Sequence, residues 1–323
     1  MIPMNRRQWA WVVAAMRSSV AWAQTYPSQP VRLVVPFPPA GGTDVVARML
    51  GNRIAATTGW NIVVDNRPGA SGNIGLDIVA KSRPDGYTVG LAQTANLAIN
   101  PALYAKMPYD ALKDFVAVAL VASVPVVLVV RRESPFASLA DVVAAARVQP
   151  GRLTQALAGN GTVGHLAGEL LARRSGIQVT NVPYKGAAPA IADLLGGQTD
   201  FMFATPQSVV ALIKAGKARA LAVSSVHRLA VLPAVPTVAE SGYPGFDVVD
   251  WKALVAPAGT PADVVRALNG AVNAALSEPD TLAQLVADGS LPMGGSPQQA
   301  QALVRAEHAR WGALVHAAGI TLD

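Results

Sequence analysis

The stretch Val31-Arg32-Leu33-Val34-Val35-Pro36-Phe37-Pro38-Pro39-Ala40-Gly41-Gly42-Thr43-Asp44 decides the fold. Its first five residues are mostly β-branched and apolar, which predicts a buried strand. The following Pro/Gly-rich segment predicts a loop, and Thr43 or Asp44 can cap a helix that runs to about residue 57. A buried strand, a glycine loop and a helix in this order begin a β/α unit.

The same order of elements is repeated along the chain. After the first helix we expect a strand over 61–65, a loop over 67–72, a helix over 73–82 and a strand over 87–92. A second unit follows with strands at 153–158, 177–182 and 199–204, and helices at 163–174 and 188–195. Strands that alternate with helices indicate parallel sheets, so we expect an α/β protein with two lobes.

Two apolar stretches, 115–130 and 218–224, fall between and after these units and predict the crossovers between lobes. The tail predicts a strand at 248–255, a helix at 261–276 and two further helices separated by 292–297. We assign this tail to the first lobe. The expected boundaries are 24–123 and 227–323 for lobe 1, and 124–226 for lobe 2.

The first 23 residues have the pattern of a signal peptide. Arg6-Arg7 form a positive region, 9–16 a short apolar core, and Ala21-Trp22-Ala23 a small-residue cleavage site. Cleavage after Ala23 predicts a periplasmic protein, exported by either the Sec or the twin-arginine route. The chain has no cysteine, which excludes disulfides, a thiol nucleophile and a lipid-anchored cysteine.

Composition disfavours a nucleic-acid partner. The formal charge is +6, of which three units lie on arginines of the first 23 residues. The other charges are scattered, and no basic stripe with interleaved aromatic residues is present. With 51% hydrophobic and 14% charged residues, the chain can bury substantial cores.

The glycine loops predict where a ligand binds. In open parallel sheets, ligands bind beyond the carboxyl ends of the strands. Each loop here lies at such an end and precedes a helix N-terminus, whose unpaired N–H groups and partial positive charge attract anions. The alternative is purely structural: the glycines serve turn geometry, Thr43, Asp44 and Thr162 are helix caps, His165 is a packing residue and Lys185 a solvated lysine.

Enzyme motifs are weak. Residues 159–164, Gly-Asn-Gly-Thr-Val-Gly, match a dinucleotide-binding pattern, but the acidic residue required near 179–182 is absent. The four histidines have no metal-ligand spacing, and neither a G-x-S-x-G elbow nor a phosphate loop occurs. A site assembled from distant residues stays open, so a secreted α/β hydrolase-like enzyme that uses His165 is one alternative.

Five segments resemble the Bug-type solute receptors of tripartite tricarboxylate transporters: 34–44, 65–75, 165–170, 183–186 and 256–261. The resemblance implies a type II periplasmic-binding-protein fold, with two Rossmann-like lobes joined by a hinge and a ligand cleft between them. It implies a monomeric receptor, not an enzyme, that needs no metal or cofactor. Its partners would be a small carboxylate ligand and the integral membrane subunits of the transporter. A receptor that signals to another partner is a further alternative.

The resemblance also implies site residues. They lie in the first loop, after the second strand and in the second lobe: Phe37, Ala40, Gly41, Gly42, Thr43 and Asp44; Ala70, Ser71 and Asn73; Gly161, Thr162, His165, Lys185 and Gly186. Their places at strand ends add Gln93, Thr94, Ala204 and Asp250.

Three positions depart from the family pattern. Ala40, Ser71 and Ala253 stand where glycine is common. Asp250, if it faces the cleft, would disfavour a second ligand carboxylate or favour a ligand amine; otherwise it is a surface residue at a strand end.

Overall fold

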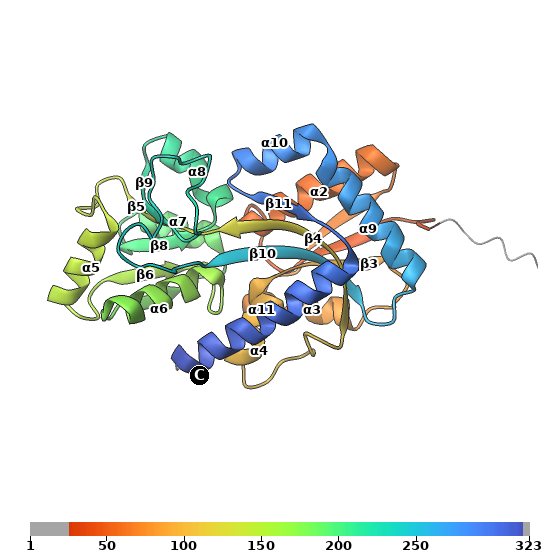
Figure 1. Ribbon diagram of the computed structural model, residues 1–323, viewed down its shortest axis with the longest axis horizontal. Coiled ribbons are helices and arrows are strands. Elements are labelled where there is room, and N and C mark those ends of the chain that lie inside the picture. Colours follow the sequence, from red (N-terminus) through yellow and green to blue (C-terminus); the bar gives the residue numbers. More distant parts are fainter. Residues whose placement is uncertain (1–25, 319–323) are drawn as a thin grey trace, which may run out of the picture.

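β1 (Val31–Val35) lies inside a six-stranded sheet of order β11-β4-β10-β3-β1-β2. It pairs in parallel with β2 (Ile62–Asn66) and β3 (Thr88–Gln93), as the first β/α unit predicts. The computed structural model describes residues 26–318, with side chains to residue 316, so the predicted signal peptide lies outside the described residues. Figure 1 shows this sheet in one half of the molecule and a five-stranded sheet of order β7-β6-β8-β5-β9 in the other. We call these halves the first and the second lobe.

The second lobe repeats the parallel unit. β6 (Thr154–Leu157) pairs in parallel with β7 (Thr180–Pro183) and β8 (Phe201–Ala204). Helices follow the strands of both units: α2 (Gly42–Thr58), α3 (Asn73–Ala80), α6 (Val163–Ser175), α7 (Ala187–Leu195) and α8 (Pro206–Lys214). Four more helical segments are η1 (Ala70–Gly72), η2 (Ala95–Ile99), α4 (Asn100–Leu103) and α5 (Leu139–Val148).

Both sheets are mixed, which corrects the expectation of parallel sheets. β10 (Val249–Pro257) runs antiparallel to β3 and to β4 (Phe115–Pro125). In the second lobe, β5 (Val127–Arg131) runs antiparallel to β8 and β9 (Ala218–Val223). The reason is the exchange of chain between lobes: β10 returns from the second lobe and therefore enters the first sheet in the direction opposite to its neighbours.

The chain crosses between the sheets twice, and the two crossings are bonded to each other. The predicted crossover at 115–130 is two strands, with Val126 alone between β4 and β5. The other crossing leads from β9 to β10. Its Ser224 accepts a hydrogen bond on Oγ from the N–H of Val126 (2.9 Å) and donates its own hydroxyl hydrogen to the carbonyl oxygen of Val248. These bonds hold the crossings side by side, where a hinge between the lobes would lie.

The tail after β10 contains α9 (Ala262–Ser277), α10 (Pro279–Ala287), β11 (Leu291–Gly294) and α11 (Pro297–Ala318). The sequence predicts only a connection where β11 forms. This short strand pairs antiparallel with β4 at the edge of the sheet, where its proline is tolerated.

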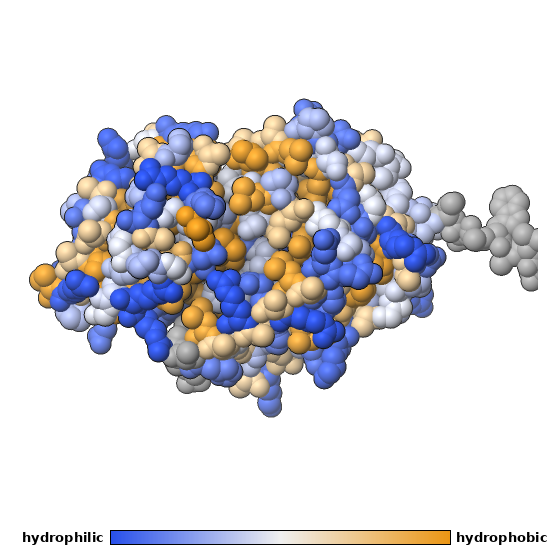
Figure 2. Space-filling model, viewed as in Figure 1, coloured by the Kyte–Doolittle hydropathy of each residue, from blue (hydrophilic) through white to orange (hydrophobic). Residues whose placement is uncertain are grey.

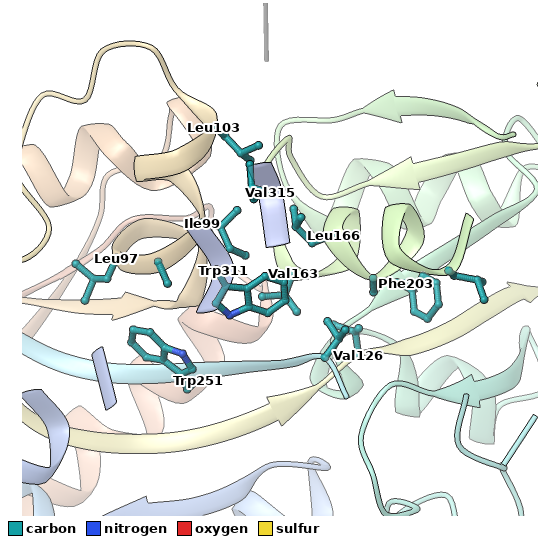
Figure 3. Packing of buried hydrophobic residues seen from close by; sticks show 14 of the residues in the cluster. Leu97, Ile99, Leu103, Val126, Val163, Leu166, Phe203, Trp251, Trp311 and Val315 are labelled. Carbon is teal, nitrogen blue, oxygen red and sulfur yellow. The ribbon is translucent and has the colours of Figure 1, made fainter. Parts of the chain in front are cut away.

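The core reaches across the boundary between the lobes. Figure 3 shows Trp311 and Val315 of α11 beside Ile99 of η2 and beside Val163 and Leu166 of α6, in one buried cluster. A second cluster lies on the other face of the first sheet, between that sheet and the helices α2 and α9. A third fills the face of the second sheet covered by α7 and α8. Within residues 26–318, none of the helices combines the length and the apolar character needed to cross a membrane.

Candidate ligand-binding site

A cavity of about 80 Å³ lies between the lobes, beyond the carboxyl ends of β1, β3, β6 and β8. It is lined by nine of the residues that the sequence analysis selects: Phe37, Gly41, Gly42, Thr43, Gln93, Thr162, Gly186, Ala204 and Asp250. A second hollow shares Phe37 and Gly186 with the first and is lined by the selected residues Ala70, Ser71 and Lys185. The two hollows are therefore neighbours, and both are lined by residues of the two lobes.

The first wall of the cavity is the start of α2. The helix begins at Gly42, and its N-cap, Gly41, has no side chain that could accept from the first N–H groups. Thr43 and Asp44 are therefore inside the helix rather than caps, which corrects the expectation from the sequence. The hydroxyl of Thr43 donates instead to the side-chain oxygen of Gln93. The first N–H groups of α2 thus have no side-chain cap where the helix meets the cavity.

The second lobe contributes three further helix starts. α7 begins after Gly186, which has a φ of 127° and gives no side-chain cap. α8 begins after Thr205, whose side chain also makes no capping bond. α6 is capped, because the hydroxyl of Thr162 accepts from the N–H of His165 at 3.4 Å. The cap on α6 agrees with the structural alternative for Thr162, although Thr162 also lines the cavity.

The uncapped starts of α2 and α7 give the cavity its anion-binding character. The first N–H groups of a helix have no partner within the helix, and the helix dipole adds a partial positive charge there. Ala187 and Ala188, at the start of α7, both line the cavity. The start of α8 offers fewer free N–H donors, because Pro206 is its first residue and has no N–H. An anion between α2 and α7 would therefore meet N–H donors from both lobes.

Asp44 turns away from the cavity and supports the loop. Its carboxylate accepts hydrogen bonds from the N–H of Ala40 (2.9 Å), from Arg48 Nε (2.9 Å) and from Asn66 Nδ2 (2.9 Å). Burial by itself raises the pKa of Asp44, but these bonds outweigh it and hold the pKa below its ordinary value. Ala40, at φ 64°, is held in the left-handed region by this arrangement.

Asn73 and Thr94 also lie outside both hollows. The side-chain oxygen of Asn73 accepts from Asn100 Nδ2 (2.7 Å) and from the hydroxyl of Tyr109 (3.0 Å). The hydroxyl oxygen of Thr94 accepts from the N–H of Trp251 at 2.8 Å. Both side chains are buried and fix the loops that follow β2 and β3.

His165 and Gly161 form a buried support for the loop before α6. The N–H of Gly161 donates to His165 Nδ1 at 3.1 Å, and His165 Nε2 lies 3.7 Å from Glu169 Oε1. Nearby His165 lowers the pKa of Glu169, although burial of Glu169 acts the other way; a 2.6 Å bond from Asn181 adds to the lowering. Within residues 26–318, the imidazole has no hydroxyl nucleophile among its bonded partners. This geometry gives the hydrolase alternative no support.

Asp250 lies inside the site rather than on the surface. It is 3% exposed, lines the cavity and bonds Lys252 Nζ through Oδ2 at 2.6 Å. Sequence reasoning missed Lys252, which is fully buried. The available signal is the alternation along β10, because residues two apart on a strand face the same side.

Sequence reasoning also missed much of the apolar lining. These residues lie in or beside the selected loops, in β8 or at the crossing: Pro38, Pro39, Val126, Ala158, Val163, Gly164, Ala187, Ala188, Pro189, Met202, Phe203 and Thr205. The two prolines lie within the quoted first loop, and Ala187 to Pro189 directly follow the selected Gly186. Nothing in the sequence pattern marks Val126 or Met202.

The lobes touch around the cavity, so the structure has the closed arrangement. Ser71 of the first lobe donates to the carbonyl oxygen of Asn160 in the second, and Gln207 of α8 donates to the hydroxyl of Ser290. A Cβ atom on Gly186 would lie 2.9 Å from Pro38 Cγ. On the face shown in Figure 2, the lobes meet along a broad boundary, with hydrophobic residues gathered beneath α10.

No metal site accompanies the cavity. Within the described part of the chain, no group of three or more histidine, aspartate or glutamate residues is arranged to hold a metal ion.

Comparisons with known proteins agree with this fold. Residues 46–320 match the family described as tripartite tricarboxylate transporter family receptor. Protein BugT of Bordetella pertussis is 40% identical over 301 residues, which cover 93% of this chain and 92% of BugT. The solved structure of R. palustris Rpa4515 with adipate has a TM-score of 0.89 at 40% identity and covers 92% of this chain and all of that one. The periplasmic binding protein BugD has a TM-score of 0.88 at 35% identity, with the same coverage.

Proposed function

This chain belongs to the tripartite tricarboxylate transporter receptor family, whose members are solute-binding receptors and not enzymes, and from that premise we propose that it binds a small organic carboxylate and delivers it to a tripartite tricarboxylate-type membrane transporter. The adipate in the structure of Rpa4515 supports the carboxylate class. The family and the leader pattern at residues 1–23 support a periplasmic location.

The observation that carries the proposal is the convergence of uncapped helix starts from both lobes on one cavity. No arginine or lysine is among the residues that line this cavity in the described part of the chain. A ligand carboxylate would therefore be held by backbone N–H groups of α2 and α7. Each hydrogen bond to an ionised group contributes about 1.5–3 kcal/mol, so a few of them support specific binding after association costs.

Binding is coupled to closure in this proposal. The first sheet with its helices moves as one lobe and residues 127–247 move as the other, about the crossings at Val126 and Ser224. The segment 227–247, which the sequence analysis assigns to lobe 1, belongs to the second lobe, because Leu229 and Leu232 lie in its buried cluster and the N–H of Val238 donates to the carbonyl oxygen of Val223. Neither α2 nor α7 alone surrounds the ligand, because they belong to different lobes. The closed monomer would then be the form that the membrane subunits receive.

The first experiment is a thermal-shift screen of the protein starting at residue 24, refolded to remove bound ligand. The panel contains mono-, di- and tricarboxylates and, as matched controls, their neutral amides. A ligand at about 100 times its Kd stabilises the folded state by about 2.7 kcal/mol. We expect a saturable rise in Tm with at least one acid and none with its amide. A panel in which no acid raises Tm would contradict the carboxylate proposal.

Delivery is tested separately in vesicles that contain the membrane subunits. Uptake of the acid found in the screen should depend on adding this protein. Uptake that is unchanged without it, from protein that binds the acid, would contradict transport and favour a signalling receptor.

A further inference from the structure

The position of Asp250 follows from the register of β10. Lys252 is opposite Gln93, the last residue of β3, so Asp250 lies two residues further, beyond the carboxyl end of β3. Residues two apart on a strand face the same side, so Asp250, Lys252 and Gln93 share the face toward α2. Both Asp250 and Gln93 line the cavity.

The carboxylate of Asp250 is only half satisfied. Its Oδ2 accepts from Lys252 Nζ at 2.6 Å, and the side chains of Lys252 and Asp250 are 0% and 4% exposed. Its Oδ1 is buried and has no hydrogen-bond partner among the described residues. Buried carboxylate oxygens are normally hydrogen-bonded, because an unpaired one has lost its water without replacement. Since Asp250 lines the cavity, a ligand is the group placed to supply the missing donor.

The charge balance restricts what that ligand group is. Asp250 is the one ionisable side chain among the cavity-lining residues of the described chain, and Lys252 already neutralises it. The site therefore lacks a hydrogen bond rather than a positive charge. A second ligand carboxylate at this position would face Asp250 without a lining cation, and a ligand ammonium would bring a charge that the pair does not require.

We infer that the ligand of this chain is a hydroxy-carboxylate, whose carboxylate meets the helix starts of α2 and α7 and whose hydroxyl donates to Asp250 Oδ1. The inference rests on the proposed function and names the ligand class within it. Lys252 is a positioning residue, because its ammonium orients the Asp250 side chain through the 2.6 Å contact without lining the cavity itself.

The test compares matched acids that differ in one group, by isothermal titration calorimetry on the refolded protein. The pairs are 3-hydroxybutyrate with butyrate, 4-hydroxybenzoate with benzoate, and malate with succinate; 3-aminobutyrate gives the ammonium arm. In the pair that fits the cavity, we expect the hydroxy acid to bind about tenfold more tightly or better, as for hydrogen bonds to ionised groups.

Variants test whether Asp250 is the group that gives the preference for the hydroxy acid. Asp250→Asn alone leaves the Lys252 ammonium buried without its partner and can fail to fold. The double variant Asp250→Leu/Lys252→Met removes both charges at similar volume, and in it the affinity ratio of the matched acids should fall toward one. The matched control is Asp77→Leu/Lys81→Met, which removes an ion pair between α3 and the residue that follows it, outside the cavity, and should keep the ratio.

The outcomes separate the two proposals. Parent acids that bind as tightly as their hydroxy forms, or an amino acid that binds more tightly than both, would overturn the hydroxyl inference and leave the receptor proposal standing. A hydroxyl preference that survives in the double variant would also overturn it, because Asp250 would not be the acceptor. If no acid of any kind binds, the receptor proposal fails as well.

Discussion

Ser71 and Asn160 are joined across the cleft: the serine hydroxyl, in the loop after β2, donates to the asparagine carbonyl oxygen, in the loop after β6. This bond exists only when the lobes are closed. Ser71→Ala should therefore weaken binding through closure. A neutral hydrogen bond contributes about 0.5–1.5 kcal/mol, so we expect Kd to rise about two- to tenfold. Calorimetry with the acid found in the screen measures it.

Ser82→Ala is the matched control for this effect. Its hydroxyl also donates to a carbonyl oxygen, that of Ile78, but within one lobe. An equal loss of affinity in both variants would show that the Ser71 bond has no special part in closure.

Gly42→Ala tests the contact between α2 and α8. A Cβ atom there would lie 2.6 Å from Thr205 Oγ1, although φ at this position suits any residue. Alanine is a good first residue of a helix, so the separate lobe should not be destabilised. Overpacking across the cleft should raise Kd about tenfold or more. Small-angle scattering with the same acid should show a less compact protein than the wild type.

Gly270→Ala serves as control for this variant, because a Cβ on Gly270 meets nothing within 4 Å. It should leave Kd unchanged. Full affinity and full compaction in Gly42→Ala would contradict the closed contact.

Ala40→Gly should stabilise the protein. Ala40 has a φ of 64°, and the left-handed conformation costs an L-residue about 1–2 kcal/mol. Glycine loses about 0.5–1 kcal/mol of this gain through its greater freedom in the unfolded chain. The net gain of about 0.5–1 kcal/mol is measurable by denaturant unfolding. Ala144→Gly, inside α5, should act in the opposite direction by about 1 kcal/mol. A loss of stability in Ala40→Gly would contradict the conformation of the loop.

Asp44 predicts an acid-sensitive contribution to stability. Its pKa is lower in the folded than in the unfolded protein, so its contribution is present above the unfolded pKa of about 3.9 and is lost as pH falls through the folded value. Asp44→Asn should cost about 1–2 kcal/mol at pH 7. The difference from the wild type should shrink below about pH 4. Urea unfolding at several pH values measures both.

The exposed first-turn residue Asp263 of α9 supplies the control. Asp263→Asn should cost clearly less than Asp44→Asn. A cost for Asp44→Asn that does not change with pH would show that the Asp44 carboxylate is not the group responsible.

The sequence predicted the elements of the two β/α units closely, because buried strands and glycine loops are local signals. The strand Val31–Val35 and the helix start at Val163 agree to the residue. The antiparallel direction of β10 and β5 was missed, since direction is set by the exchange of chain between lobes and not by local pattern. The loops selected for the site do surround the cavity, because carboxyl ends of strands gather at one edge.

Individual side chains were harder to place. Asp44, Asn73 and His165 belong to the selected loops, yet their side chains do not line the cavity. Those of Asp44 and His165 accept from backbone N–H groups, and that of Asn73 accepts from other side chains. Which way a loop side chain turns depends on partners far along the chain, such as Tyr109 for Asn73. The alternation along β10 puts Asp250 and Lys252 on one face, but their 2.6 Å contact and the burial of both are seen only in the structure.

The helix α11 has a consequence for how the molecule opens. Trp311 and Val315 remain packed against Val163 and Leu166 only if the lobes rotate about a line close to that contact (Figure 3). The axis of the opening rotation would then lie along α11. Separation would be largest at the opposite margin, where Gln207 meets Ser290. The distance between spectroscopic labels on α8 and α10 would increase on opening, whereas a label on α11 would move little.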